Sequence, residues 1–403
     1  MDYTTLCPQQ GKLEVVNGAQ PLSPFHTDIL AFIDDLSQEI IKEEEFRRFP
    51  EIIAAGYWLR KSAIQRLKHI FIDRGGKQRV ARGLVFHLAP SNVDTIFMYS
   101  LFLSLLVGNT NIVRISFKSN KNIQGLLAVI NRVCANHISV SHRFLIVNYE
   151  HDDTINGYFS EICAMRVIWG GHETINRIRS IQIPPSAHEI TFADKFSIAL
   201  INAENYLAYN KKEDIAIRFF NDAFWFDQLA CSSPRLIGWI GTSEQITTAK
   251  EKFWSSISAV IAQKEYESSP SGNMDTYVAL CQYAALDKNT TIPDSHFPSI
   301  KRITIPKTTE LSFRDIHCGQ GLFIEMNFDD LKDVAHITQS KDQTITAFGF
   351  SSEAMKKQLI PYLKGGVNRI VGFGNALTFS HDWDGYDLLN EFTRIITVED
   401  ALY

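Results

Sequence analysis

The sequence predicts an α/β fold with a parallel sheet covered by helices on both faces. From about residue 80, strand-like apolar runs at 80–88, 111–117, 143–149 and 164–170 alternate with segments whose apolar residues recur at three- and four-residue intervals. At 403 residues the chain also exceeds the size that one core usually serves, which indicates two lobes and an appendage. With 45% apolar and 21% charged residues, the composition is that of an ordinary globular protein.

Charge and cysteine usage exclude several functional classes. A formal charge of −5 gives neither the basic face that nucleic acids require nor a membrane-surface patch. The start of the chain shows no basic segment followed by an apolar one, so we expect no secretory signal and a cytoplasmic protein. The longest apolar run, 96–107, is about twelve residues against the roughly twenty that span a bilayer, and predicts a buried helix. The six cysteines show no spacing suited to zinc, so we expect reduced thiols and no metal site.

The order of elements predicts where the lobes divide. Helical spacing covers 25–72, and the strand, helix, strand alternation that follows is typical of a nucleotide-binding lobe. A further strand is expected at 196–201, helices at 212–228 and 243–264, and a loop rich in serine, proline and glycine after that. We therefore divide the chain into a cofactor-binding domain with N-terminal helices (1–225), a catalytic domain (226–375) and a C-terminal segment (376–403). That last segment is expected to return to the cofactor domain or to form a subunit interface.

Two segments follow predicted strands at the carboxyl edge of the first sheet, where α/β proteins bind ligands. Asn92 could donate its amide to an oxyanion, although Ser91 or Asn92 could equally cap the next helix. The pair Gly170–Gly171 lies between a strand and a helix, and its backbone could approach a pyrophosphate, although a simple turn explains it as well.

Cys231 is the most informative residue. It lies between a predicted helix and a predicted strand, in a turn with small polar neighbours rather than in an apolar stripe. A thiolate here would be a strong nucleophile if local dipoles lowered its pKa. The alternative is that this cysteine is a small buried apolar residue, as cysteines without a disulfide usually are.

Taken in order, these segments resemble the LuxC-type acyl-CoA reductases, the fatty-acid reductase component of bacterial luminescence systems. The resemblance spans about residues 80–390 and is specific because the cysteine segment and the tryptophan–aspartate–glycine segment occur together. It rests on HLAPSNV, GNTNIVRIS, VIWGG, FADKFSIALI, FDQLACSSP, QTITAFGF and NRIVGFGNALTFSHDWDGYDLL. That family is similar in turn to the aldehyde dehydrogenase superfamily. The resemblance therefore implies a Rossmann-type cofactor domain, an α/β catalytic domain and a small oligomerisation element.

The same resemblance implies roles for individual residues. Cys231 matches the acyl-accepting nucleophile and Gln228 the glutamine of the superfamily's GQxC motif, while Asn92 matches the oxyanion asparagine. On the cofactor side, Arg114 stands where the superfamily often has a lysine that touches the adenosine ribose, Ser116 follows on the same strand, and the pair Gly170–Gly171 would pass near the cofactor phosphates.

One departure from the superfamily concerns hydrolysis. If Lys195 matches the lysine of the ELGGK-like motif, Thr191 stands where hydrolytic aldehyde dehydrogenases have the glutamate that activates water, although Glu189 is close enough to confuse the alignment. A chain without that base would retain its acyl intermediate for hydride or thiol chemistry.

The resemblance implies reduction of a fatty acyl thioester, with NADPH as the expected cofactor and NADH as the alternative. Expected partners are acyl-CoA or an acylated protein, an acyl-protein synthetase and an acyltransferase, and further copies of the chain in a homo-oligomer; service in luminescence is one possible use of the aldehyde. Two alternatives stay open: an NAD-dependent enzyme that oxidises aldehydes, and an inactive scaffold for a synthetase.

Overall fold

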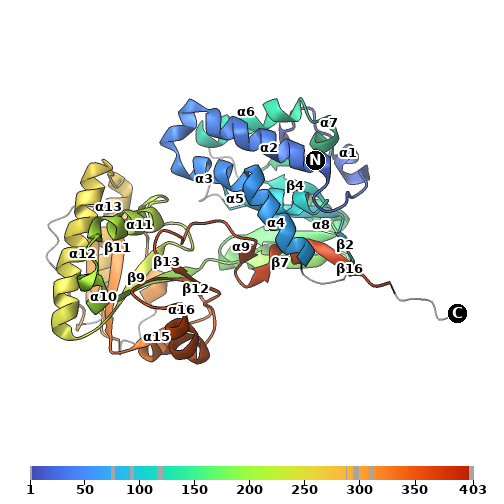
Figure 1. The fold of residues 1–403 in the computed structure, drawn as a ribbon. Coiled ribbons are helices and arrows are strands. Elements are labelled where there is room, and N and C mark those ends of the chain that lie inside the picture. Colours follow the sequence, from blue (N-terminus) through green and yellow to red (C-terminus); the bar gives the residue numbers. More distant parts are fainter. Residues whose placement is uncertain are drawn as a thin grey trace. The chain divides into compact units, whose positions relative to one another are not determined.

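A computed structural model describes residues 2–73, 78–90, 95–115, 121–286, 288–293, 299–307 and 313–398. The chain forms two compact units, which are described separately. Unit 1 comprises Met1–Asp194 and Phe379–Tyr403, and unit 2 comprises Lys195–Thr378. Each unit contains a six-stranded sheet, and Figure 1 shows the fold with some of its elements labelled.

Unit 1 is built on a sheet with the strand order β1-β5-β4-β3-β6-β7, in which only β1 is antiparallel. Its strands are β1 (Thr4–Cys7), β3 (Leu84–Leu88), β4 (Thr110–Arg114), β5 (Phe144–Asn148), β6 (Met165–Trp169) and β7 (His188–Phe192). From β3 onward this order is the Rossmann-type arrangement, whose direction reverses beside β3 and β6. The carboxyl ends of β3 and β6 are therefore the expected ligand-binding point.

Helices cover both faces of this sheet. One face packs Phe86 and Val147 against Val16, Phe159 and Ile175. The helices of unit 1 before β14 are α1 (Leu13–Gly18), α2 (Thr27–Lys42), η1 (Glu44–Arg48), α3 (Pro50–Leu59), α4 (Lys61–Asp73), α5 (Ile96–Leu106), α6 (Lys121–Cys134), α7 (Ile138–Ser141), α8 (Asp153–Ile162) and α9 (His172–Arg179). All of α5 is buried, which confirms that the long apolar run is a core helix.

The predicted strand 80–88 is two strands. Gly83 has a φ of 129°, which breaks the run between β2 (Gln78–Ala81) and β3. β2 leaves the main sheet and pairs with β16 (Thr393–Ile396) from the other end of the chain, and Figure 1 shows these two strands side by side. The C-terminal segment thus returns to unit 1, where it also contains β14 (Asp382–Trp383), β15 (Tyr386–Asp387) and α17 (Leu388–Glu391).

Unit 2 has a parallel sheet with the order β10-β11-β9-β8-β12-β13. The strands are β8 (Phe196–Asn202), β9 (Pro234–Ile240), β10 (Lys301–Thr304), β11 (Leu322–Phe328), β12 (Asp342–Phe348) and β13 (Arg369–Gly372). The units divide between Asp194 and Lys195, earlier than the expected boundary at 225–226. The reason is that β8 and α11 belong to this second sheet and its core rather than to the first.

Both faces of the second sheet are also buried. Along β8, Ala199 and Ile201 face one core, while Ile198 and Leu200 face the other, as the two-residue period of a strand requires. The helices are α10 (Ala203–Ala208), α11 (Lys212–Phe224), α12 (Ser243–Gln263), α13 (Pro270–Leu286), α14 (Phe313–Ile316), α15 (Leu331–Ile337), α16 (Ser352–Ala354), η2 (Met355–Leu359) and η3 (Ile360–Tyr362).

The loop predicted after residue 264 is present at 264–269, but it ends where helix α13 begins. Pro270 is its first residue, a position where the missing N–H costs nothing, and the Ser269 hydroxyl accepts a hydrogen bond from Gly272 N at 3.0 Å. The serine and proline that suggested a loop therefore start a helix. Among the described helices, none combines the length and apolarity needed to cross a membrane.

Candidate active site

The carboxyl edge of the unit 1 sheet holds the described residues that were predicted to bind a cofactor. Gly170 and Gly171 follow β6 directly, and the Gly170 N–H donates to Phe192 O at 3.1 Å. Gly171 is the N-cap residue of α9, and no side chain caps that helix. A Cβ added to Gly171 would meet no atom within 4 Å. Packing therefore leaves open space at a helix N-terminus, which suits a phosphate group.

Arg114 ends β4 at the same edge. Its guanidinium lies 5.4 Å from the centre of the Tyr149 ring, and Nη2 donates to Tyr149 O at 3.2 Å. Its buried Nε has no hydrogen-bond partner among the described residues. Burial lowers the pKa of Arg114 from its ordinary value, and the nearby Arg177 lowers it further. A guanidinium with an unused donor at this edge of the sheet fits a phosphate of a dinucleotide.

Two predicted residues lie outside the described part of the chain. Asn92 belongs to 91–94 and Ser116 to 116–120, so their predicted roles stay predictions.

Thr191 and Glu189 have different surroundings in β7. Glu189 accepts a 2.6 Å hydrogen bond from Nε of the buried Arg166, and its other oxygen is 3.3 Å from Nε of Arg179. Its carboxylate therefore neutralises Arg166, which pairs with it in register across β6 and β7. Such a carboxylate is poorly suited to activating water, whereas Thr191 has no carboxylate to offer.

Cys231 lies in unit 2, in the turn between α11 and β9, and is half-buried. None of the six cysteines, all of which are described, forms a disulfide. The Cys231 carbonyl accepts a 2.7 Å hydrogen bond from the Ser197 hydroxyl at the start of β8, and that hydroxyl accepts one from Thr344 N at 3.3 Å. The turn is thus tied to the amino ends of β8 and β12.

Gln228 braces the same turn from within. It is 1% exposed; its Nε2 donates to Pro234 O at 2.8 Å and its Oε1 accepts from Gly321 N at 3.1 Å. The first bond closes the turn around Cys231, and the second joins it to the segment before β11. Gln228 is therefore a structural support of the turn.

The segment before β11 is shaped to receive the cysteine turn. Gly319, Gln320 and Gly321 all have positive φ, at 77°, 58° and 77°. A Cβ on Gly319 would lie 2.9 Å from Leu229 and 3.1 Å from Asp227 O. Glycine is required here because the two turns approach so closely.

His317 precedes these residues and is held as a neutral ring. Its Nε2 donates to Leu322 O at 2.8 Å while Nδ1 accepts from Gly319 N at 3.0 Å. Burial, with a further contribution from the Arg235 charge, lowers the pKa of His317 to about 3. The ring therefore fixes the backbone behind the cysteine turn.

Sequence reasoning missed Ser197, His317 and the turn 319–321. Each comes from a segment far from Cys231 in the chain, so no spacing relates it to the cysteine. The two glycines flanking Gln320 were the only local signal, and they indicate a turn but not what the turn contacts.

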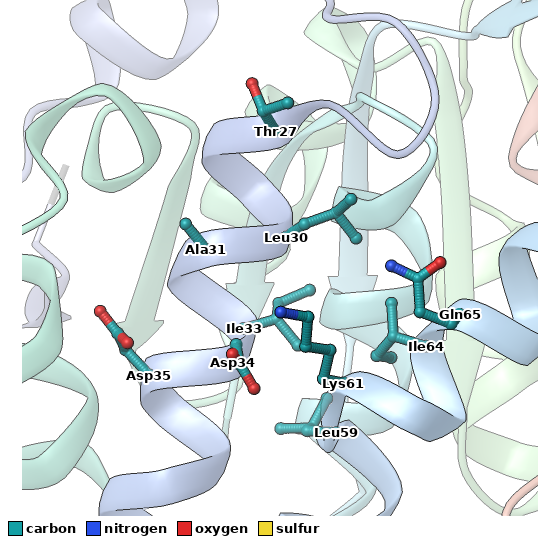
Figure 2. A pocket seen from close by; sticks show the side chains of 10 residues that line it. All are labelled: Thr27, Leu30, Ala31, Ile33, Asp34, Asp35, Leu59, Lys61, Ile64 and Gln65. Atoms are coloured by element: carbon teal, nitrogen blue, oxygen red, sulfur yellow. The ribbon is translucent and has the colours of Figure 1, made fainter.

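Two cavities lie away from the predicted residues. One of about 340 Å³ in unit 1 is lined by α2, α3 and α4, with Leu30, Ile33, Leu59 and Ile64 on its apolar side, and Figure 2 shows these side chains. The other, of about 670 Å³ in unit 2, includes Tyr266. None of the predicted site residues that the structure describes lines either cavity.

The comparison with known structures gives the fold. An oxidoreductase from Marinobacter aquaeolei is similar with a TM-score of 0.69 and 13% identity, over 96% of this chain and 88% of that one. Aldehyde dehydrogenase 21 from Physcomitrella patens has a TM-score of 0.68 and 10% identity, over 92% and 85%. Glyceraldehyde-3-phosphate dehydrogenase GapN from Methanocaldococcus jannaschii, complexed with NADP, has a TM-score of 0.66 and 10% identity, over 92% and 89%. The chain thus has the aldehyde dehydrogenase fold.

The comparison with protein families is more specific. No curated protein sequence matches the chain. A sequence profile of the acyl-CoA reductase (LuxC) family matches residues 68–275, which is more than half of the chain and includes Arg114, Gly170, Gly171 and Cys231. Fold and profile together support an oxidoreductase that acts on the aldehyde–acyl couple with a nicotinamide cofactor. The chain belongs to the LuxC family of acyl-CoA reductases.

Proposed function

We propose that this protein reduces a fatty acyl-CoA thioester to the fatty aldehyde with NADPH, through an acyl-enzyme on Cys231. The observation that carries the proposal is the placement of Cys231: half-buried, in a turn held by Ser197 and Gln228, within the segment that the family profile matches. Cysteines that serve only the core, such as Cys7 and Cys163, are buried in this chain.

The first half of the reaction uses this chain's own groups. The Cys231 thiolate attacks the thioester carbonyl, a carbon–sulfur bond forms, and the carbonyl electrons move to oxygen. The Cys231 N–H and the Asn92 amide are the proposed donors to that oxyanion; losing one such donor typically slows acyl transfer about a hundred- to a thousandfold. Collapse of this intermediate expels the CoA thiolate and leaves the acyl group on Cys231.

The second half requires a bound nucleotide. Gly170, Gly171 and Arg114 are the proposed holders, with the open N-terminus of α9 and the unused Arg114 Nε supporting this assignment. Reduced nicotinamide, when bound, supplies the hydride that converts the acyl group to the aldehyde oxidation state. Cys231 then leaves as a thiolate while the aldehyde departs.

Thr191 supports reduction over hydrolysis. Because β7 offers no uncommitted carboxylate at Thr191 or Glu189, the acyl-enzyme has no base there to activate water. Arg114 supports NADPH over NADH, because its unused donor would give a 2′-phosphate a partner at this edge of the sheet.

The test combines purified protein, tetradecanoyl-CoA and NADPH, and follows absorbance at 340 nm together with aldehyde formation. Cys231→Ala should abolish turnover, and Cys281→Ala is the matched control because Cys281 is an exposed cysteine outside the turn. A parallel assay with NADH ranks the cofactors. Freshly reduced protein that neither turns over nor carries an acyl group on Cys231 by mass spectrometry would contradict the proposal.

Partners form a further part of this proposal. An acyl-protein synthetase and an acyltransferase would supply the acyl group, and the family resemblance alone supports them. A homo-oligomer is supported by exposed apolar side chains at the end of the C-terminal segment, Ile395, Ile396 and Val398. Light scattering coupled to gel filtration tests it: a monomer at micromolar concentration would contradict the oligomer.

A further inference from the structure

Two residues just ahead of Cys231 have strained backbones. Asp227 and Gln228 have φ values of 49° and 61°, a region that residues with a Cβ seldom adopt. Two consecutive residues in this region persist only when their surroundings hold them there. Gln228 is held by the turn that it braces, as described above. The contacts of Asp227 are different.

Asp227 is held at three atoms. Its N–H donates to Phe224 O at 3.2 Å, and its carbonyl accepts from Gln320 N at 2.7 Å. Its carboxylate accepts a 2.6 Å hydrogen bond from the Tyr266 hydroxyl. A bond of that length to a carboxylate is of the strong, charge-assisted kind.

The end of helix α12 places Tyr266. The Tyr266 N–H donates to Ile261 O at 3.1 Å and the Glu265 N–H donates to Ala262 O at 3.2 Å, which is the Schellman arrangement with Glu265 in the left-handed position at a φ of 51°. The Tyr266 ring packs at 5.1 Å from the Phe224 ring, at the end of α11. The position of the hydroxyl is thus set by helix α12 and by the aromatic core.

Tyr266 remains a hydrogen-bond donor over the working pH range. Burial raises the pKa of Tyr266 well above its ordinary value, and the bond to Asp227 raises it further. The phenol is therefore protonated at neutral pH, and its hydrogen is available to the Asp227 side chain.

We propose that Asp227 and Tyr266 are positioning residues for the Cys231 nucleophile. The hydrogen bond between them holds Asp227 in its left-handed conformation. The path of the backbone from Asp227 to Cys231 is then fixed by two further hydrogen bonds: Leu229 N donates to Phe226 O at 2.8 Å, and Ser233 N donates to Ala230 O at 3.0 Å. Without the bond, Asp227 relaxes and the Cys231 N–H moves. A misplacement of about 1 Å can slow a reaction about a hundredfold. The inference rests on the proposed role of Cys231 as acyl acceptor.

The test separates positioning of the N–H from reactivity of the thiol. Acylation of Cys231 by tetradecanoyl-CoA without nucleotide is followed by intact-protein mass spectrometry, and alkylation of Cys231 by iodoacetamide is followed in parallel. Acylation needs a donor to the oxyanion, whereas alkylation does not. Tyr266→Phe should slow acylation about tenfold or more and change alkylation less than about twofold.

Three further variants and one control variant define the interaction. Asp227→Asn keeps an acceptor for the Tyr266 hydroxyl and should acylate within about threefold of the wild-type rate, while Asp227→Ala should match Tyr266→Phe. The double variant Asp227→Ala/Tyr266→Phe should be no slower than either single one, because both remove the same bond. Tyr283→Phe is the matched control: it also removes a phenol of unit 2, one that donates to the backbone carbonyl of Phe313.

The outcomes distinguish this inference from the proposed function. No acylated Cys231 in the wild-type protein overturns the proposed function and this inference with it. Wild-type acylation with an unchanged rate in Tyr266→Phe overturns this inference alone, and so does a loss that Tyr283→Phe shares. If Tyr266→Phe does not fold, the acylation rates of Asp227→Asn and Asp227→Ala are compared instead. Equal acylation rates in these two variants would overturn this inference.

Discussion

The side chain of Gln228 accepts a hydrogen bond from the amide of Gly321, 93 residues further along the chain, at 3.1 Å. Because the same side chain donates to Pro234 O, one buried amide group joins three segments behind Cys231. The nucleophile turn is therefore supported by contacts that lie outside it.

Gln228→Leu should destabilise the protein and reduce its activity. It removes the partner of the buried Gly321 N–H and one hydrogen bond to the Pro234 carbonyl, and an unpaired buried group costs about 1–3 kcal/mol. Urea unfolding followed by tryptophan fluorescence measures the change in midpoint. Gln282→Leu, at an exposed position of α13, is the control. Equal midpoints for the two variants would show that the buried amide contributes nothing.

The stability of unit 2 should fall between pH 4 and pH 7 because of Asp222. This carboxyl is 1% exposed, and burial raises its pKa to about 7, although hydrogen bonds from Gly374 N at 2.7 Å and Ala376 N at 2.9 Å oppose the rise. Because the pKa of Asp222 is higher in the folded than in the unfolded state, its contribution to the free energy of unfolding is complete below about pH 4. That contribution is lost as the pH rises through 7. Each unit of pKa difference corresponds to about 1.4 kcal/mol.

Asp222→Asn, which cannot ionise, should lack this dependence. Urea midpoints of the variant and the wild type, compared at half-unit steps from pH 4 to pH 8, should diverge steadily up to pH 7 and then run parallel. Curves that are parallel over the whole range would place the pKa of Asp222 at its ordinary value.

His317 should have the opposite effect. Because burial lowers its pKa to about 3, the folded protein disfavours the imidazolium form, and stability is lost as the pH falls from 6.5 toward 3. NMR of ring-labelled protein should show one histidine, absent from the spectrum of His317→Gln, whose shifts stay constant from pH 8 to pH 5. A titration midpoint near 6.5 for that signal would contradict the buried neutral ring.

Arg114→Gln should weaken the use of NADPH more than that of NADH. Removing a guanidinium from a phosphate contact costs about 1–3 kcal/mol, so KM for NADPH should rise about five- to a hundredfold while kcat with saturating nucleotide changes little. Arg132→Gln removes an exposed arginine that pairs with Glu39 and Glu43, and should leave both KM values unchanged. An equal rise in KM for both nucleotides would assign Arg114 to a part of the cofactor that they share.

Local patterns in the sequence predicted much of the fold. The strands β3 to β6 and the buried helix α5 lie where alternating runs of apolar residues predicted them. The loop predicted after residue 264 is confirmed for 264–269 but not beyond, because Pro270 and Gly272 break a helix interior but are accepted in a first turn. Gly272 also makes room for Gln320, whose Oε1 would lie 2.3 Å from an added Cβ.

The sequence by itself determined the alternation of strands and helices, the α/β class and the place of Cys231 in a turn before a strand. These features depend on neighbouring residues, whose periodicity and turn chemistry act over a few positions. Only the tertiary structure decided that β8 belongs to the second sheet, that β16 returns to β2, and that Gln228 and Asp227 are held by Gly321 and Tyr266. Such contacts join positions tens to hundreds of residues apart, and they form because burying apolar faces brings those segments together, which no local pattern records.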